Sequence, residues 1–206
     1  MTEDFCIDIR GVTLEYYEDE HLYLADGVIV PSISEIVRSV FPGKYAHVDE
    51  ETMRRASERG TAVHKAIEEY CCTGSAGDIP EVNNFRFLER QYEFSVEETE
   101  CPVLLFDGGV PVAAGRFDLA LNMRGKMALA DIKTTATLDK SYLAYQLNFY
   151  RQAWIDSADE DAGALYGIHL RGETVRRLVG IPLMPREQIM DVLHNFQKQK
   201  NEGENT

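Results

Sequence analysis

One apolar stretch carries two charges that a buried strand ordinarily excludes. Residues 128–133 read ALADIK, so Asp131 and Lys133 interrupt a run that is otherwise typical of a buried β-strand. A charge in such a strand is costly unless it has a partner. Because side chains alternate along a strand, the two charges share one face. That face therefore holds either a simple salt bridge on a solvated surface or a polar site.

The residues before this strand predict that it belongs to an antiparallel hairpin. Residues 94–134 have a period of two, with turn sequences at FDGGVP and MRGK. A tight turn at Arg124-Gly125, or a four-residue loop over 123–126, pairs residues whose numbers sum to 249. Asp118 then lies across from Asp131, with Cβ atoms roughly 5 Å apart. The opposite face is expected to be core, formed by Phe117, Leu119, Leu121, Ala128, Ala130 and Ile132.

Two carboxylates at this distance either share a proton or hold a cation. The surrounding ligands are oxygen atoms and at most one imidazole, which favours Mg²⁺ or Mn²⁺, as one or two ions. A cation beside two carboxylates would activate water and stabilise charge on a phosphoryl group. Lys133, if its pKa were lowered, could serve as the base.

The rest of the chain predicts one mixed α/β domain over residues 1–206, without an internal repeat. A hairpin is expected over 12–30, a core over about 50–182, and a C-terminal helix and tail over 185–206. Ser32 and Glu35 fit a capping box at the start of a helix, and residues 41–47 are expected to be looser. The remaining expected elements are helices over 50–70, 82–94 and 140–156, a loop over 71–81, strands over 164–171 and 175–182, and a frayed tail over 197–206.

Two predicted helices carry further polar residues. His64 stands in the helix 50–70, and Gln146 and Tyr150 are four residues apart in the helix 140–156. Each observation is weak alone, because a helical histidine is commonly a hydrogen-bonded residue of the interior, and the Tyr150 face could be a core stripe.

Together and in this order, these residues resemble the PD-(D/E)XK nuclease superfamily, in particular its RecB-like and phage lambda-type exonuclease branch. The motifs are R-G-T-x-x-H, G-x-x-D, D-x-K and Q-x-x-x-Y, and the resemblance covers roughly residues 16–154. They are carried by Arg59, Gly60, Thr61 and His64; Gly115 and Asp118; Asp131, Ile132 and Lys133; and Gln146 and Tyr150.

The resemblance implies a restriction-endonuclease-like core, a mixed central sheet flanked by helices. It implies that His64, Asp118, Asp131 and the backbone carbonyl of Ile132 bind the metal. Asp118, Asp131 and Lys133 would be catalytic, with Lys133 positioning or deprotonating the attacking water, and Gln146 and Tyr150 would line the DNA channel. No cysteine follows Cys101, so the iron–sulfur cluster of some related nucleases is not expected.

The overall charge of −14 opposes nonspecific attraction to a polyanion. Basic residues nevertheless gather near residues 54–65, 86–90 and 171–177. We expect Arg55, Arg59 and Arg151 to line a nucleic-acid path, with the acidic loops facing away. The four cysteines are expected to be reduced, and the chain to be cytoplasmic and without a membrane span.

The resemblance implies a metal-dependent deoxyribonuclease, more an exonuclease than an endonuclease, acting in phage or prophage recombination or in repair. Its partners would be DNA and a DNA-binding recombination protein, and assembly into an oligomer is compatible with the sequence. Two alternatives stay open at this point. One is a hydrolase of another phosphate ester, and the other is a non-catalytic DNA-binding or scaffolding domain that keeps the nuclease fold.

Overall fold

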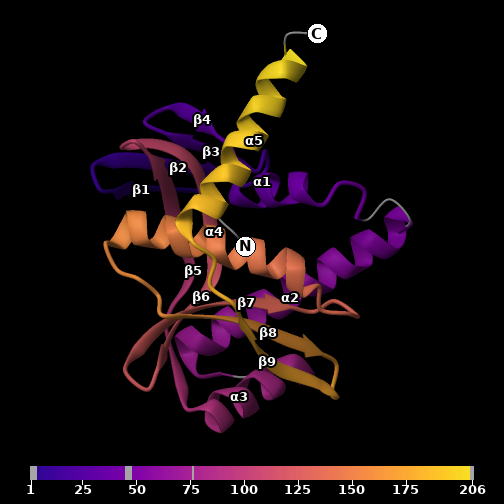
Figure 1. The fold of residues 1–206 in the computed structure, drawn as a ribbon. Coiled ribbons are helices and arrows are strands. Elements are labelled where there is room, and N and C mark those ends of the chain that lie inside the picture. The colour runs from indigo at the N-terminus through magenta and orange to yellow at the C-terminus, as the bar shows by residue number, and fades with distance from the viewer. Residues whose placement is uncertain (1–3, 45–47, 76, 205–206) are drawn as a thin grey trace.

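The computed structural model describes residues 4–44, 48–75 and 77–204. Its centre is a five-stranded sheet in the order β5-β6-β7-β8-β9 (Figure 1). Neighbouring strands are antiparallel except for β7 and β8, which are parallel, so the sheet is mixed as the sequence predicts. The strands are β5 (Phe94–Asp107), β6 (Val110–Met123), β7 (Lys126–Lys133), β8 (Ala164–Arg171) and β9 (Val175–Ile181).

Helices cover both faces of this sheet (Figure 1). On one face, α4 (Lys140–Ala158) packs with α1 (Ile33–Val40) and α5 (Arg186–Glu204) over a core that includes Leu129 and Leu165. On the other, α2 (Glu50–Thr73) and α3 (Pro80–Tyr92) cover a second core that includes Ile132 and Ile168. The protein is therefore a layered α/β structure in which β7 is buried on both faces, and this confirms the predicted fold class.

A small antiparallel sheet precedes the helices. It contains β1 (Phe5–Ile9), β2 (Val12–Tyr17), β3 (Leu22–Ala25) and β4 (Val28–Val30). The prediction of a hairpin over 12–30 was therefore incomplete, since β1 adds a strand. A turn at Asp26-Gly27 joins β3 to β4, and both of its residues have positive φ. This sheet joins the large one where the backbone of Ala114 donates to the carbonyl of Pro31 at 3.1 Å.

The helix boundaries follow from their caps. Ser32 accepts a hydrogen bond from the backbone of Glu35 at 3.0 Å, as its position before α1 predicts. Helix α2 continues to Thr73, beyond the predicted end at 70, and stops at Gly74 in the left-handed conformation. The expectation of a frayed tail from 197 was wrong, since α5 continues to Glu204. Of the looser stretch 41–47, residues 45–47 lie outside the described part.

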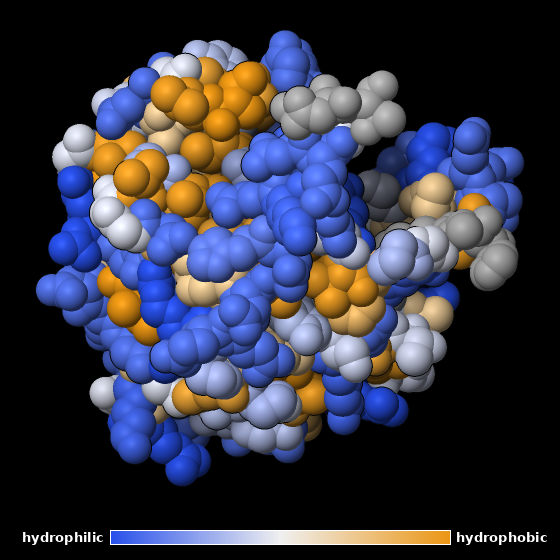
Figure 2. All heavy atoms as spheres, turned by 45° about the horizontal axis from the view of Figure 1, so that its top comes forward, coloured by the Kyte–Doolittle hydropathy of each residue, from blue (hydrophilic) through white to orange (hydrophobic). Residues whose placement is uncertain are grey.

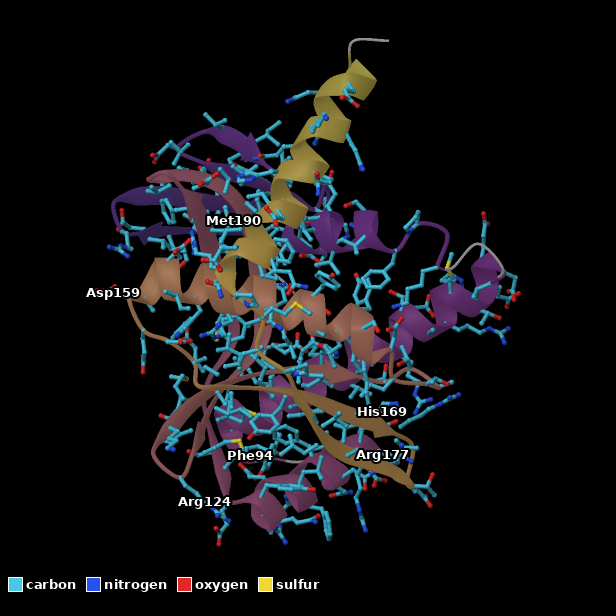
Figure 3. All side chains as sticks on the ribbon, viewed as in Figure 1. Phe94, Arg124, Asp159, His169, Arg177 and Met190 are labelled. Atoms are coloured by element: carbon cyan, nitrogen blue, oxygen red, sulfur yellow. The ribbon has the colours of Figure 1, made fainter. Side chains whose placement is uncertain are left out.

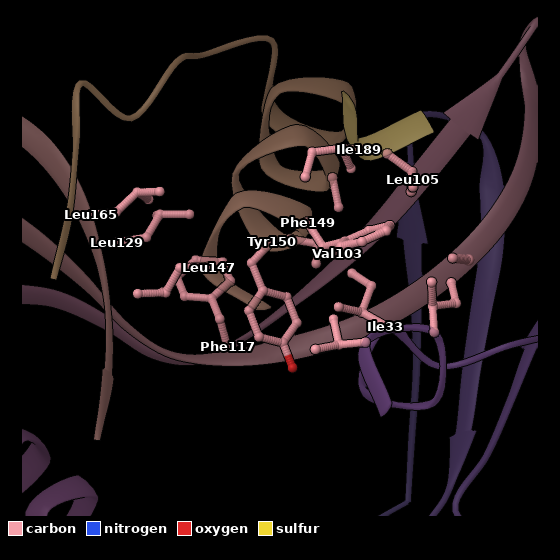
Figure 4. Close-up of a cluster of buried hydrophobic side chains, with 14 of the residues drawn as sticks. Ile33, Val103, Leu105, Phe117, Leu129, Leu147, Phe149, Tyr150, Leu165 and Ile189 are labelled. Atoms are coloured by element: carbon pink, nitrogen blue, oxygen red, sulfur yellow. The ribbon is translucent and has the colours of Figure 1, made fainter. Parts of the chain in front are cut away.

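The predicted apolar face of the hairpin is divided between the two cores. Leu119 and Leu121 lie in the core under α2 and α3, as expected. Phe117 lies instead under α4, where its ring centroid is 6.0 Å from that of Tyr150 and 5.6 Å from that of Trp154. Figure 4 shows Phe117 and Tyr150 within this cluster. The strict alternation that the prediction assumed therefore fails at Asp118, between Phe117 and Leu119.

Hydrophilic residues cover most of the face drawn in Figure 2, with one gathering of hydrophobic residues toward the upper left. Among the large exposed hydrophobic residues, Val28 and Ile29 of β4 are about two-thirds exposed (65% and 64%). None of the helices in the described residues combines the length and the apolar character that spanning a membrane requires.

Candidate metal centre and active site

A cavity of about 630 Å³ lies between the small sheet, α1, α2, α4 and β6. Tyr16 and Tyr23 of the small sheet form one wall, and His64 and Asp118 line the cavity from α2 and β6. The small sheet, which lies outside the central layers, thus helps to enclose the polar residues that the sequence singled out.

His64 and Asp118 are in contact at the inner end of this cavity. The Nδ1 atom of His64 lies 3.4 Å from Oδ1 of Asp118, and its Nε2 atom lies 3.1 Å from the carbonyl oxygen of Ile132. The other carboxylate oxygen of Asp118 accepts a hydrogen bond from the backbone of Ile132 at 2.6 Å. Three of the four predicted metal ligands, His64, Asp118 and Ile132, are therefore brought together.

A third acidic residue, Glu100 of β5, completes this cluster, and the sequence reasoning missed it. Single ligand atoms of His64, Glu100 and Asp118 all lie within 4.8 Å of one another. A void of about 10 Å³ borders these three side chains and Ile132. That volume is close to what one ordered water needs, and one imidazole with two carboxylates is a donor set that suits Mn²⁺ or Mg²⁺. The residues present therefore fit a single divalent ion.

The β6–β7 register is the predicted one. The β6–β7 pairs run from Met123 and Lys126 to Leu119 and Ala130, and the residue numbers of every pair sum to 249, as predicted. The pairing ends there and does not include Asp118 and Asp131, so their predicted facing stays a prediction.

Asp131 itself points to a different partner. Its Oδ2 atom lies 2.7 Å from Nζ of Lys133, outside the angles of a hydrogen bond, so the contact is a close ion pair. Its side chain is 3% exposed, and it is not part of the cluster of His64, Glu100 and Asp118. The two carboxylates therefore have separate partners, Asp118 with His64 and Asp131 with Lys133.

The electrostatics of the cluster reflect its burial. Burial alone would lower the pKa of His64, but the charge of Asp118 outweighs it and raises the pKa to about 9. Burial and the charge of Asp118 raise the pKa of Glu100 to about 7. Both ring nitrogens of His64 face acceptor oxygens, which agrees with an imidazolium. The charge of His64 in turn lowers the pKa of Asp118 and limits the rise in the pKa of Glu100.

Lys133 is held in its charged form. Burial would lower its pKa, but the carboxylates of Asp131 and Asp118 outweigh that effect and raise it. Burial raises the pKa of Asp131 to about 6, against the neighbouring ammonium, which lowers it. The lowered pKa that is expected of Lys133 beside a bound cation stays a prediction. An ammonium in this place can orient and stabilise an anionic group rather than remove a proton.

Gln146 and Tyr150 both lie on the buried side of α4 and are 8% and 4% exposed. Tyr150 also lines the large cavity, and Figure 4 shows its ring among apolar side chains with the hydroxyl at the edge of the cluster. Burial raises its pKa, against hydrogen bonds with Ser34 and Gln146, so the hydroxyl stays a donor. The residue is both a core aromatic and a polar group facing the cavity.

Gly115 has a packing role beside Tyr150. A Cβ atom at Gly115 would lie 2.8 Å from Cε1 of Tyr150 and 3.2 Å from Cδ1 of Ile33. The glycine thus lets the tyrosine ring and α1 approach β6. At Gly60 a Cβ atom would make an ordinary contact of 3.5 Å with Thr134, so the glycine of the R-G-T motif has no comparable steric reason.

The three arginines predicted to contact nucleic acid are all paired with carboxylates. Arg55 is bound by Glu51, one turn earlier on the exposed surface of α2. Arg59 is bound by the buried Glu81 of α3. Each of these two arginines therefore already has its charge neutralised.

Arg151 donates to Asp161 at 2.7 Å, and its side chain is 12% exposed. Its position is that of a structural ion pair beside α4. Two other basic residues, Arg38 and Lys65, line the large cavity and have no ion pair within the described residues.

Comparison with known proteins places few constraints on function. No protein-family model matches the sequence, and no curated protein matches it. Among solved structures, the chain is similar to one described as "Crystal structure of SSO0001", with a TM-score of 0.49 and 16% sequence identity. The alignment covers 84% of this chain and 76% of that chain.

Proposed function

We propose that the protein is a metal-dependent nuclease that hydrolyses the phosphodiester bonds of DNA. The observation that carries the proposal is the convergence of His64, Glu100 and Asp118, which line both one small void and the large cavity. The resemblance to the PD-(D/E)XK superfamily and the mixed sheet flanked by helices support the same reading.

The cluster of His64, Glu100 and Asp118 would hold Mg²⁺ or Mn²⁺, with the carbonyl oxygen of Ile132 within reach. When bound, such an ion lowers the pKa of water and stabilises negative charge on a phosphoryl group. Binding requires His64 to give up its proton, because an imidazole ligates only in its neutral form. Deprotonated Glu100 and Asp118 supply the compensating negative charge.

The protein's own residues have distinct tasks in this proposal. The ammonium of Lys133, held by Asp131, would attract the phosphate and stabilise the charge that develops on its oxygen atoms. The hydroxyl of Tyr150 would donate a hydrogen bond to the substrate from the wall of the cavity. Tyr16 and Tyr23 restrict the cavity on the side of the small sheet, which limits how much of a strand can enter.

The decisive experiment is incubation with end-labelled single- and double-stranded DNA, and with RNA of the same sequence, in Mg²⁺, Mn²⁺ or EDTA. Asp118→Asn and Lys133→Ala should abolish cleavage, and EDTA should do the same. Their matched controls are Asp107→Asn, on the exposed β5–β6 turn, and Lys126→Ala, at the other end of β7. These two should cleave as the wild type does.

Cleavage that survives EDTA or Asp118→Asn would contradict the proposed mechanism. Binding of DNA without cleavage under any metal condition would instead favour a scaffolding domain. The spacing of labelled products separates exonuclease from endonuclease action.

A further inference from the structure

A second cavity lies away from the metal cluster, between α3 and β9. Its volume is about 240 Å³, several times the roughly 30 Å³ that one water occupies in the liquid. Its walls combine guanidinium groups, amides and one aromatic ring, contributed by Asn83, Asn84, Arg86, Phe87, Arg90 and Arg176. We call these six residues the arginine groove.

The three arginines of this groove differ from most others in the protein because they have no carboxylate partner. Arg54, Arg55, Arg59, Arg116, Arg124, Arg151 and Arg186 all form ion pairs. Within the described residues, Arg86, Arg90 and Arg176 form none. Acidic residues outnumber Lys and Arg by 35 to 21, so a group of unneutralised arginines on one surface is a local exception to the charge of the whole chain.

The arrangement of these groups is ordered. Residues 83, 86, 87 and 90 share one face of α3, because they are three and four positions apart. The Arg176 guanidinium lies 3.9 Å from the ring centroid of Phe87, whose side chain is 43% exposed. Arg86 lies over the Tyr70 ring at 5.6 Å, and its buried Nε atom has no hydrogen-bond partner among the described residues.

Hydrogen bonds fix the groove relative to the helix that carries His64. Asn84 donates to the carbonyl of Gly172 at 2.7 Å, and the backbone of Gly172 donates to Glu81 at 2.7 Å. Glu81 also binds Arg59, five residues before His64 on α2. The arginine groove and the metal cluster therefore sit on one continuous scaffold formed by α2, α3 and the β8–β9 turn.

The neighbouring Arg177 of β9 does not line the arginine groove. Arg177 is the ladder partner of His169, and Figure 3 shows the two at the same end of β8 and β9. Side chains alternate along a strand, so Arg177 points away from the face on which Arg176 meets Phe87. The groove itself is thus defined by Arg176 together with the face of α3.

We propose that the arginine groove binds the phosphodiester backbone of a nucleic-acid strand outside the scissile site, a proposal that rests on the nuclease function proposed above. Free guanidinium groups beside an exposed aromatic ring are the combination that binds the backbone and bases of a strand. The acidic remainder of the surface repels a polyanion, so a strand is held mainly where positive charge is left unneutralised.

The test is fluorescence anisotropy of a labelled 30-nucleotide strand in EDTA, over 50–200 mM salt, so that binding is measured without hydrolysis. The double variant Arg90→Ala/Arg176→Ala should bind at least 10-fold more weakly. The slope of log affinity against log salt should fall by about 1.4, from roughly 0.7 for each lost phosphate contact on a single strand.

The matched control is Arg54→Ala/Arg124→Ala, which removes the same formal charge at two exposed arginines that are already paired with glutamates. It should retain the wild-type affinity and salt slope. If both double variants bind equally, only net charge matters and the arginine groove is not a site. A polyglutamate peptide that competes as strongly as the oligonucleotide would also overturn the assignment to nucleic acid.

A small phosphodiester, bis-p-nitrophenyl phosphate, separates this proposal from the nuclease proposal. Its hydrolysis requires only the catalytic cavity and no strand held outside it, so Arg90→Ala/Arg176→Ala should hydrolyse it at the wild-type rate. Reduced hydrolysis of this compound would show that the double variant disturbs the catalytic site, and would overturn a separate groove. Absence of all cleavage by the wild type would defeat the nuclease proposal, while the anisotropy result would still decide whether the groove binds a strand.

Discussion

Replacing Glu100 by Gln should make the metal-free protein more stable at pH 8 and should weaken its response to metal. The pKa of Glu100 rises from an ordinary 4.5 to about 7 because of burial and the charge of Asp118. Its side chain is 25% exposed, so solvent screens this effect only in part. The folded protein therefore holds the proton of Glu100 more tightly than the unfolded chain does.

The sign of the effect follows from linkage. Below pH 4.5 the carboxyl group is protonated in both the folded and the unfolded state and does not lower the free energy of unfolding. Between pH 4.5 and 7 the unfolded chain releases the proton first, so stability falls, and the full cost is present above pH 7. Raising the pKa from 4.5 to about 7 costs at most about 3.5 kcal/mol of stability, and partial exposure of the side chain reduces this to about 3 kcal/mol. Glutamine carries no charge and avoids this cost.

Thermal unfolding in EDTA at pH 5 and pH 8 measures the prediction. For a chain of this size, about 3 kcal/mol corresponds to a Tm increase of roughly 6–12 °C. Glu100→Gln should show most of this increase at pH 8 and little at pH 5. Glu98→Gln, exposed on the same strand, is the matched control and should change Tm by about 1 °C or less at either pH.

Addition of Mn²⁺ at pH 8 gives the second half of the test. Ligand binding stabilises the folded state, so Mn²⁺ should raise the Tm of the wild type and of Glu98→Gln. It should raise the Tm of Glu100→Gln much less. Equal changes in Tm at both pH values would refute the burial argument. Equal stabilisation of Glu100→Gln and wild type by Mn²⁺ would refute Glu100 as a ligand.

Three further predictions follow from single contacts. Gly115→Ala should lower the free energy of unfolding by about 1–3 kcal/mol, because its Cβ would lie 2.8 Å from Tyr150. Gly60→Ala, in a helix with room for a Cβ, should raise the free energy of unfolding by about 0.5–1 kcal/mol. Urea unfolding measures both variants, and equal effects would contradict the packing argument. Lys133→Met should raise the pKa of Asp131 above about 6, because the substitution removes the ammonium charge that lowers this pKa. An NMR titration of the Asp131 carboxyl carbon measures the change, and an unchanged pKa would show that the ion pair is not formed in solution. Arg55→Glu should have an affinity for DNA within about twofold of that of Lys126→Glu, because Glu51 already neutralises Arg55. A loss of affinity specific to Arg55→Glu would show that Arg55 contacts the nucleic acid.

Much of the candidate site could be predicted because it depends on local rules. The turn at Arg124-Gly125 sets the β6–β7 register over residues 119–123 and 126–130. The alternation of side chains explains why Asp131 and Lys133 meet. His64 could be proposed only from the order of the motifs, because its distance from Asp118 depends on how α2 packs on the sheet.

Glu100 was missed because its register depends on an irregularity. Near the β5–β6 turn the residue numbers of each pair sum to 217, as for Asp107 and Val110. If this register continued, Glu100 would lie across from Phe117. A register shift between Leu105 and Phe106 changes the sum to 218, so that Glu100 falls opposite Asp118. A one-residue shift changes which residue lies opposite every side chain farther from the turn. The local sequence contains no signal that predicts this bulge.

The sequence by itself determined the mixed α/β class, most helix starts, the β6–β7 register and the pairing of Asp131 with Lys133. These depend on periodicity, capping and turn chemistry over a few residues. Tertiary structure alone decided that Glu100 joins His64 and Asp118, that Arg59 and Arg151 are neutralised, and that Arg86, Arg90 and Arg176 are not. Those outcomes depend on which charges approach one another after packing, and a Coulomb interaction varies with distance in space rather than with separation along the chain.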